Sequence, residues 1–258
     1  MNVCTAASMG DDSEFDMEIA YFRNAVESLG VSTEEVDDST CLRFLKARSM
    51  HVDKAAKMFV QSHTWRTSFV PQGYIPIDHI TSELNANKCA LQGYSKEGYP
   101  LVIGFGAKHY PGESSLETFK KYVVYILDKT IASASARGTE KIAAIGDLKD
   151  MAYKNVDLKA YIAAFQILQD YYPERLAKLY LINAPNFFIG IWKLVSRFLD
   201  QPTKDKICVL SNDVIREVLL SDVDVETLPS DYGGKAELLF IQDVDVPNFP
   251  RQVASVPA

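Results

Sequence analysis

YYPERLAKLYLINAPNFFIGIWKLVSRFLDQPTKDK, residues 171–206, contains a strand, a turn and an unusually apolar helix in close succession. Aromatic and β-branched residues at 179–182 predict the strand, and Asn-Ala-Pro at 183–185 predicts the turn. A helical period follows over 187–199, and Pro202 would end it. Polar residues flank this unit on both sides, so the stretch places a polar cluster beside an apolar helix.

The helix predicted at 187–199 carries an apolar stripe at helical spacing. The stripe consists of Phe188, Ile191, Trp192, Val195, Phe198 and Leu199. Phe187 and Leu194 broaden it, whereas Lys193, Arg197 and Asp200 avoid it. One interpretation is a core helix packed on a sheet. The other is a mobile lid, here called the gate helix, which covers an apolar cavity and can rest on a bilayer surface. The period alone does not choose between them.

The chain predicts an all-helical N-terminal module followed by an α/β domain. Helical patterns occur at 15–29, 39–48 and 53–69, with Ser39 and Asp53 as expected N-caps. A proline-containing stretch at 71–76 separates these helices from a different pattern. The expected divisions are a disordered tail at 1–14, the helical module at 15–75, the α/β domain at 76–245 and a C-terminal tail at 246–258.

Strands and helices alternate in the predicted α/β domain, and such alternation indicates a mostly parallel sheet. The strand near Ile142 and Ala144 lacks polar alternation, so both of its faces should be buried. The expected elements are strand 100–105, helix 115–135, strand 141–146, helix 157–170, strand 179–182, helix 187–199, strand 207–210 and helix 213–220.

Composition restricts the possible functions of this 258-residue chain. A formal net charge of −7 argues against a nucleic-acid footprint and against a polybasic membrane anchor, so any membrane contact should be local and transient. No run reaches the roughly 18 apolar residues of a spanning helix, and the N-terminus lacks the features of a signal peptide. We therefore expect a cytoplasmic monomer. The four cysteines show no CxxC spacing, which favours reduced thiols over a disulfide frame or a metal site.

Glu174, Thr203 and Lys206 lie at the two ends of the strand–helix unit, and a βα connection can bring them to one edge of the sheet. A carboxylate, a hydroxyl and an ammonium suit a polyol and a phosphate. The alternative is a solvated surface, in which Glu174 pairs with Arg175 and the run from Lys204 to Lys206 forms an exposed turn.

Motifs of catalysis are missing from the sequence. It contains no GxSxG, HExxH, GxxxxGK[ST] or complete GxGxxG pattern, so we expect no enzyme. Its histidines, at 51, 63, 79 and 109, fall on different predicted elements. Asp147 ends a predicted strand, where open α/β sheets often hold functional groups. A helix cap or a buried hydrogen-bond acceptor explains Asp147 equally well.

Several short motifs in a fixed order resemble the CRAL-TRIO lipid-binding family, and within it the yeast-type phosphatidylinositol transfer proteins. The resemblance covers about 38–247, and the chain's size is similar to that of stand-alone plant members. The motifs are Leu42-Arg43-Phe44-Leu45-Lys46-Ala47-Arg48, Asp147-Leu148-Lys149, Tyr172-Pro173-Glu174-Arg175, Asn183-Ala184-Pro185, Phe198-Leu199-Asp200, Leu228-Pro229 and Tyr232-Gly233-Gly234.

The resemblance implies an α/β domain whose sheet floors a deep apolar lipid pocket, with the helix at 187–199 as its gate. It also implies that Arg48, Glu174, Thr203 and Lys206 hold an inositol headgroup and its phosphate. The ligand would be phosphatidylinositol, with no cofactor besides bound lipid and no metal. Burial of acyl chains gives enough affinity for exchange to require opening at a membrane.

Two positions depart from the family pattern that the resemblance implies. Ser49 stands where a second basic residue usually contacts the phosphate, a loss of about 1.5–3 kcal/mol unless another cation replaces it. The predicted pocket wall of Ile142, Ala144 and Val102 is more apolar than in members that bind phosphatidylcholine. A phosphatidylcholine phosphate would find few partners there, so any second ligand should be another lipid.

These observations favour a soluble protein that binds phosphatidylinositol, exchanges it with membranes and takes part in phosphoinositide signalling. One alternative is a carrier of a sterol-like ligand. Another is a regulatory module whose lipid cargo sets the conformation offered to a protein partner.

Overall fold

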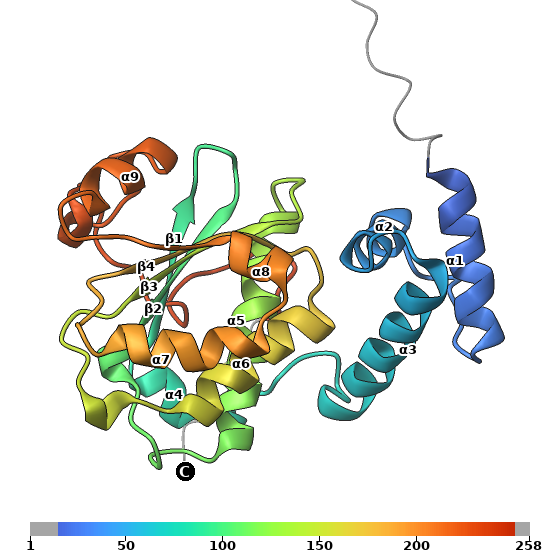
Figure 1. Cartoon of the computed structure of the whole chain (residues 1–258), viewed down its shortest axis with the longest axis horizontal. Coiled ribbons are helices and arrows are strands. Elements are labelled where there is room, and N and C mark those ends of the chain that lie inside the picture. Colours follow the sequence, from blue (N-terminus) through green and yellow to red (C-terminus); the bar gives the residue numbers. More distant parts are fainter. Residues whose placement is uncertain (1–14, 251–258) are drawn as a thin grey trace, which may run out of the picture. The chain divides into compact units, whose positions relative to one another are not determined.

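The computed structural model describes residues 15–250, and the chain divides between Phe69 and Val70 into two compact units. Figure 1 shows their helices and strands. The tail predicted at 1–14 and most of the one predicted at 246–258 lie outside the described residues. Each unit is described separately below.

The N-terminal unit contains three helices, α1 (Asp16–Ser28), α2 (Asp38–Ala47) and α3 (Val52–Phe69). Each helix contributes an aromatic ring to the core. The ring of Phe59 meets those of Phe22 and Phe44 edge to face, at centroid distances of 5.7 and 5.1 Å. The Asp37 side chain accepts a hydrogen bond from the amide of Thr40. Asp37, not the predicted Ser39, is therefore the N-cap of α2.

The C-terminal unit is built on a five-stranded sheet in the order β1-β2-β3-β4-β5. Its strands are β1 (Cys89–Tyr94), β2 (Pro100–Phe105), β3 (Ile142–Asp147), β4 (Leu176–Ile182) and β5 (Ile207–Val209). Only the β1–β2 pair is antiparallel. The prediction of a mostly parallel sheet is confirmed. The helices of the unit are α4 (Thr81–Asn85), α5 (Leu116–Ser135), α6 (Leu158–Tyr171), α7 (Phe188–Val195), α8 (Gln201–Asp205) and α9 (Ile215–Asp222).

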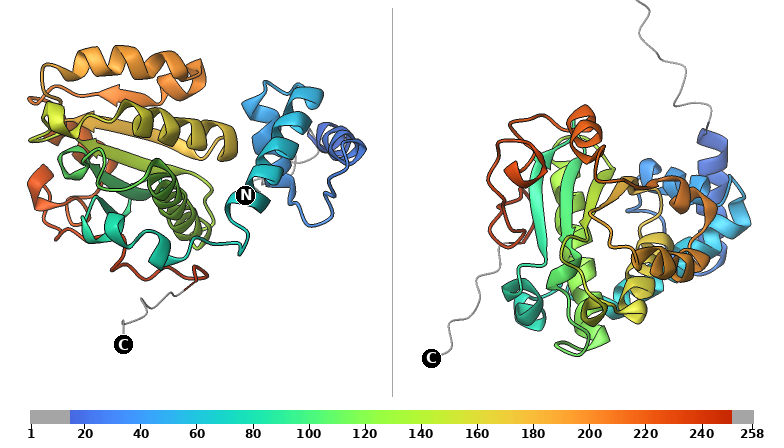
Figure 2. Two further views of the ribbon diagram at one scale, coloured as in Figure 1. Left: turned by 90° about the horizontal axis from the view of Figure 1, so that it is seen from below. Right: turned by 60° about the vertical axis from the view of Figure 1, so that its left-hand side comes forward.

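Chain order decides which face of the sheet each helix covers. Strands β2 to β5 follow one another across the sheet, and right-handed crossovers place all their connecting helices on one face. That face carries Leu179 and Leu181, which pack with α6 and α7. The opposite face packs against α9 and the segment after it, and Figure 2 (right) shows this red segment across the sheet from the yellow and orange helices.

Strand β1 is absent from the predicted elements. Its sequence, CALQGY, contains Gln92 and Gly93, which interrupt the apolar pattern of a buried strand. Tertiary contacts replace that pattern, because the Gln92 amide donates to the carbonyls of Thr227 and Glu237 and its oxygen accepts from the amide of Leu239. The segment near Leu239 thus covers the outer edge of the sheet.

Candidate functional site

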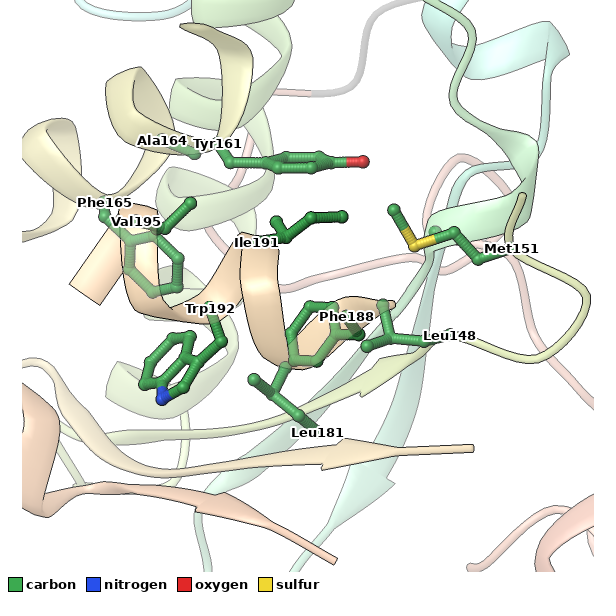
Figure 3. Close-up of a pocket in the computed structure, with 11 residues that line it drawn as sticks. Leu148, Met151, Tyr161, Ala164, Phe165, Leu181, Phe188, Ile191, Trp192 and Val195 are labelled. Atoms are coloured by element: carbon green, nitrogen blue, oxygen red, sulfur yellow. The ribbon is translucent and has the colours of Figure 1, made fainter. Parts of the chain in front are cut away.

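An apolar cavity of about 150 Å³ lies between the sheet and α7. Figure 3 shows side chains converging on it from α6, α7, β4 and the segment after β3. Burial raises the pKa of Tyr161, one of these side chains, to about 12, so its hydroxyl is neutral at physiological pH. The lining residues are Gly106, Leu148, Met151, Tyr161, Ala164, Phe165, Leu181, Phe188, Ile191, Trp192 and Val195.

Helix α7 presents part of the predicted stripe to this cavity. Phe188, Ile191 and Val195 are buried at i, i+3 and i+7. The predicted helix at 187–199 differs from the structure at its end, because α7 stops at Val195 and continues as a 3-10 turn to Phe198. The tighter 3-10 winding changes the direction of the side chain. Phe198 therefore leaves the stripe and is 51% exposed.

The outer side of α7 is unusually apolar for an exposed surface. Ile189 is 63% exposed and Leu194 is 46% exposed, and Phe198 continues this apolar surface. Lys193 and Arg197 are exposed between them. We call these five residues the outer face of α7. They combine large apolar groups with cations, the composition of a helix that lies at a bilayer interface.

The three residues predicted as pocket wall share one face of the sheet with cavity-lining Leu181. Val102, Ala144 and Leu179 pair in one row across β2, β3 and β4, and Gly104, Gly146 and Leu181 pair in the next row. Ile142 lies two positions before Ala144 and faces the same way. None of the three lines the cavity of Figure 3, which lies nearer the carboxyl ends of the strands.

Gly104 marks additional space on the same face of the sheet. A Cβ atom added there would meet no atom within 4 Å, although β2 is an inner strand. At Gly146, by contrast, a Cβ atom would meet Leu181 Cδ2 at 2.7 Å. This face of the sheet therefore leaves more space over Gly104 than over Gly146.

Glu174 and Lys206 meet at the opposite ends of these strands. Lys206 Nζ lies 3.0 Å from Glu174 Oε2, and each side chain is about one-quarter exposed. Both precede strands, β4 and β5 respectively, so the pair occupies the amino ends. Thr203 lies one turn before Lys206 in α8, whose N-cap Asp200 accepts a hydrogen bond from the Thr203 amide. Arg175 donates to the Glu140 carbonyl.

Arg48, the fourth residue predicted to hold the headgroup, belongs to the N-terminal unit. It is the C-cap of α2, and its Nη1 donates to the Ala47 carbonyl at 2.9 Å. Ser49 follows in a left-handed conformation with φ 51°. The structure thus brings Glu174, Thr203 and Lys206 into one region of the C-terminal unit, and the participation of Arg48 remains a prediction.

Asp147 acts as a buried hydrogen-bond acceptor that ties three segments together. Its carboxylate accepts from the Lys149 amide at 2.9 Å, from Asn183 Nδ2 at 2.8 Å and from the Tyr232 hydroxyl at 2.8 Å. These contacts agree with the interpretation of Asp147 as a buried hydrogen-bond acceptor. The segments that it joins include the turn that leads into α7.

His109 also takes part in a buried polar network. Its Nε2 lies 3.4 Å from Asp157 Oδ2, and its Nδ1 lies 3.5 Å from Lys88 Nζ. Lys88 forms a 2.9 Å ion pair with Glu83, which also accepts from the Ser114 hydroxyl. These residues join α4, the residue before β1, the segment after β2 and the start of α6. Because their spacing in sequence follows no motif, the sequence does not reveal the network.

Among residues 15–250, no three histidine, cysteine, aspartate or glutamate side chains gather in a way that could hold a metal ion. Cys41, Cys89 and Cys208 are free thiols, and burial raises the pKa of Cys89. No helix in this part of the chain is both long and apolar enough to cross a bilayer.

The fold and the site together define a class: an α/β protein with an apolar cavity closed by a helix. Models of two domains match the sequence, the CRAL/TRIO domain at residues 84–234 and the CRAL/TRIO N-terminal domain at 18–61. The chain belongs to the CRAL/TRIO family, which confirms the resemblance drawn from the sequence motifs.

Curated relatives span nearly the whole chain. The SEC14 cytosolic factor of Kluyveromyces lactis is 30% identical over 94% of this chain and 89% of its own length. The phosphatidylinositol/phosphatidylcholine transfer protein SFH9 of Arabidopsis thaliana is 30% identical over 88% of this chain and 42% of its own length. The crystal structure of Sfh5 has the same fold, with a TM-score of 0.66 and 18% identity over 93% of each chain.

Proposed function

We propose that this protein binds phosphatidylinositol with its acyl chains under α7 and transfers it between membranes. The observation that carries the proposal is a polar pair and an apolar cavity at opposite ends of the same strands, together with a helix over the cavity that has an apolar outer face. The name of one relative above, a phosphatidylinositol/phosphatidylcholine transfer protein, supports phosphatidylinositol as a ligand.

The dimensions of the sheet suit a phospholipid. From Leu176 to Leu181, β4 spans about 16 Å at about 3.3 Å per residue. The hydrocarbon of one bilayer leaflet is about 15 Å thick, half of the usual 30 Å or so. A headgroup at Glu174 and Lys206 would therefore send its acyl chains along this face to the cavity near Leu181.

The polar residues supply the chemistry of an inositol phosphate. Lys206 would contact the phosphate, Glu174 would accept from ring hydroxyls and Thr203 would donate its hydroxyl. We propose that Arg48 adds a second cation from the N-terminal unit. Ile142, Ala144 and Val102 would contact the acyl chains as the pocket wall, and they offer no hydroxyl to a phosphatidylcholine phosphate.

Lipid exchange in this proposal requires α7 to move. The cavity of about 150 Å³ accommodates one benzene-sized ring, whereas ligand pockets usually occupy about 300–1,000 Å³. Each buried CH₂ contributes about 0.8 kcal/mol, so bound acyl chains leave very slowly into water. The outer face of α7 would dock on a bilayer and let the chains pass directly into it. Contact with the membrane would be transient in this proposal. We also propose that the protein is a cytoplasmic monomer and needs no cofactor.

A transfer assay tests the proposed function. Donor vesicles carry labelled phosphatidylinositol, acceptor vesicles carry none, and the label that reaches the acceptors is measured with and without protein. We expect clear acceleration by the protein, and a much smaller acceleration when the label is on phosphatidylcholine. Phosphatidylinositol transfer at the protein-free rate would refute the proposal.

A further inference from the structure

Helix α7 begins without a polar anchor of its own. Phe187 occupies the N-cap position, where no side chain accepts a hydrogen bond from the helix. Phe188, Ile191 and Val195 hold the helix down through apolar contacts. Apolar contacts are not directional, and a bilayer can replace them, so they do not by themselves define one closed position.

One specific contact occurs where α7 begins. The ring of Phe187 stacks on that of Tyr153, with centroids 4.3 Å apart and planes at 24°. Tyr153 is 76% exposed, so it contributes nothing to the interior of the unit. It lies in the 3-10 turn η3 (Tyr153–Asn155), which follows β3. The stack thus connects the segment after β3 to the start of α7.

The turn that carries Tyr153 is held in place by the hydrogen bonds of a buried side chain. Asn155 is 1% exposed, and its Nδ2 donates to the carbonyls of Ala107 and His109 at 3.0 and 2.9 Å. Its Oδ1 accepts from the Ala152 amide at 2.9 Å. The Tyr161 hydroxyl donates to the Asn155 carbonyl at 2.6 Å. Two of these hydrogen bonds fix the turn to the segment after β2 and one fixes it to α6, while the bond from Ala152 closes the turn on itself.

We propose that the Tyr153–Phe187 stack is a latch that holds α7 closed, a role that rests on the proposed function of α7 as a gate. Tyr153 is in this account a positioning residue, fixed on the body of the unit, and Phe187 is its moving partner. A bilayer surface accommodates aromatic rings at its interface, so it can separate the two rings where lipid is exchanged. Stacked pairs of this kind shift an opening equilibrium by about two- to tenfold.

Hydrogen exchange of the full-length protein tests the latch without any lipid transfer. We expect Tyr153→Ala to accelerate exchange of the amides at 188–195 by about two- to tenfold, with α5 unchanged. Tyr153→Phe keeps the ring and should restore the original rate. Tyr21→Ala removes a tyrosine that is 61% exposed in the N-terminal unit and serves as the matched control. Unchanged exchange in α7, or equal acceleration in α5, would overturn the latch.

Fluorescence gives a second readout, because the chain has only two tryptophans and Trp192 lies in α7. In a Trp65→Phe background, emission reports on α7 alone. Tyr153→Ala should increase the quenching of Trp192 by acrylamide, and an unchanged value would contradict the latch. The two proposals can fail separately. If the protein does not transfer phosphatidylinositol but Tyr153→Ala still accelerates hydrogen exchange in α7, the proposed lipid is refuted and the latch is kept.

Discussion

Lys206 Nζ and Glu174 Oε2 lie 3.0 Å apart and join the starts of β4 and β5. Each partner is only partly exposed, so neither charge is fully hydrated. A bound phosphate could take over the Lys206 contact, and inositol hydroxyls could take over that of Glu174. The pair thus holds together the cation that a phosphate would need and the carboxylate that inositol hydroxyls would need.

Lys206→Ala should weaken phosphatidylinositol binding by about 10- to 150-fold, because a hydrogen bond to a charged group contributes about 1.5–3 kcal/mol. Transfer of labelled phosphatidylinositol measures the effect, and circular dichroism checks folding. Lys204→Ala makes the same charge change two residues away and should leave transfer nearly intact. Equal losses in both variants would indicate a general effect of charge and argue against the site.

Replacing Ile189 and Phe198 together by serine should reduce binding to phosphatidylcholine vesicles severalfold, because both side chains are at least half exposed on the outer face of α7. Co-sedimentation with vesicles measures the effect. Added salt should change binding little, because the chain carries a net charge of −7 and docking would rest on apolar insertion. A steep loss of binding in salt would contradict this account of docking.

Gly104→Val should lower the amount of lipid that the protein takes up from vesicles while leaving its thermal stability equal or higher. The added side chain extends into space over the sheet floor, and valine suits a strand better than glycine does. Phosphate analysis of the re-isolated protein gives the lipid content. An unchanged content would show that acyl chains do not pass over Gly104.

Periodicity was sufficient to predict the parallel strands, the long helices and the apolar face of α7, because these elements bury residues at regular spacing. It failed where tertiary contacts replaced the pattern. Strand β1 depends on hydrogen bonds from Gln92 to residues far along the chain. Phe198 left the predicted stripe because the helix tightened after Val195. Neither effect has a local signal.

The candidate site was also predicted from the sequence only in part. The sequence suggested that Glu174, Thr203 and Lys206 gather at a sheet edge, and the structure places them in one region. Most cavity-lining residues from α6 and the segment after β3, such as Phe165 and Met151, were missed. Their apolar side chains look like ordinary core residues until the packing of α7 is known.

Lys88→Met should lower the free energy of unfolding by about 3–5 kcal/mol, because it removes the cation that pairs with the buried Glu83 carboxylate and leaves only the hydrogen bond from Ser114. Urea denaturation measures the change. Lys54→Met, at an exposed helix position, is the control and should have little effect. The double variant Lys88→Met/Glu83→Gln should recover part of the loss. A loss below about 1 kcal/mol in the single variant would show that the pair is not a buried ion pair in solution.

The ionised carboxylate of Asp222 should increase the free energy of unfolding at neutral pH, and this contribution should disappear in acid. Burial raises the pKa of Asp222, but hydrogen bonds from Lys178 and Tyr180 outweigh it, so the pKa lies below the ordinary 3.8. A lowered folded-state pKa stabilises the protein above pH 3.8 and loses this effect as the pH falls through the folded value. Urea denaturation should show Asp222→Asn less stable than the parent at neutral pH, with the difference shrinking below pH 3.8. A pH-independent difference would exclude this charge effect.

The most direct test of lipid binding is to identify what the protein extracts from a membrane. Full-length protein is incubated with vesicles of mixed phospholipids, phosphatidylinositol and sterol, re-isolated, and analysed by mass spectrometry. The account predicts phosphatidylinositol enriched over its fraction in the vesicles, and that enrichment lost in Lys206→Ala. Bound sterol, or phospholipid in the same proportions as the vesicles, would contradict it.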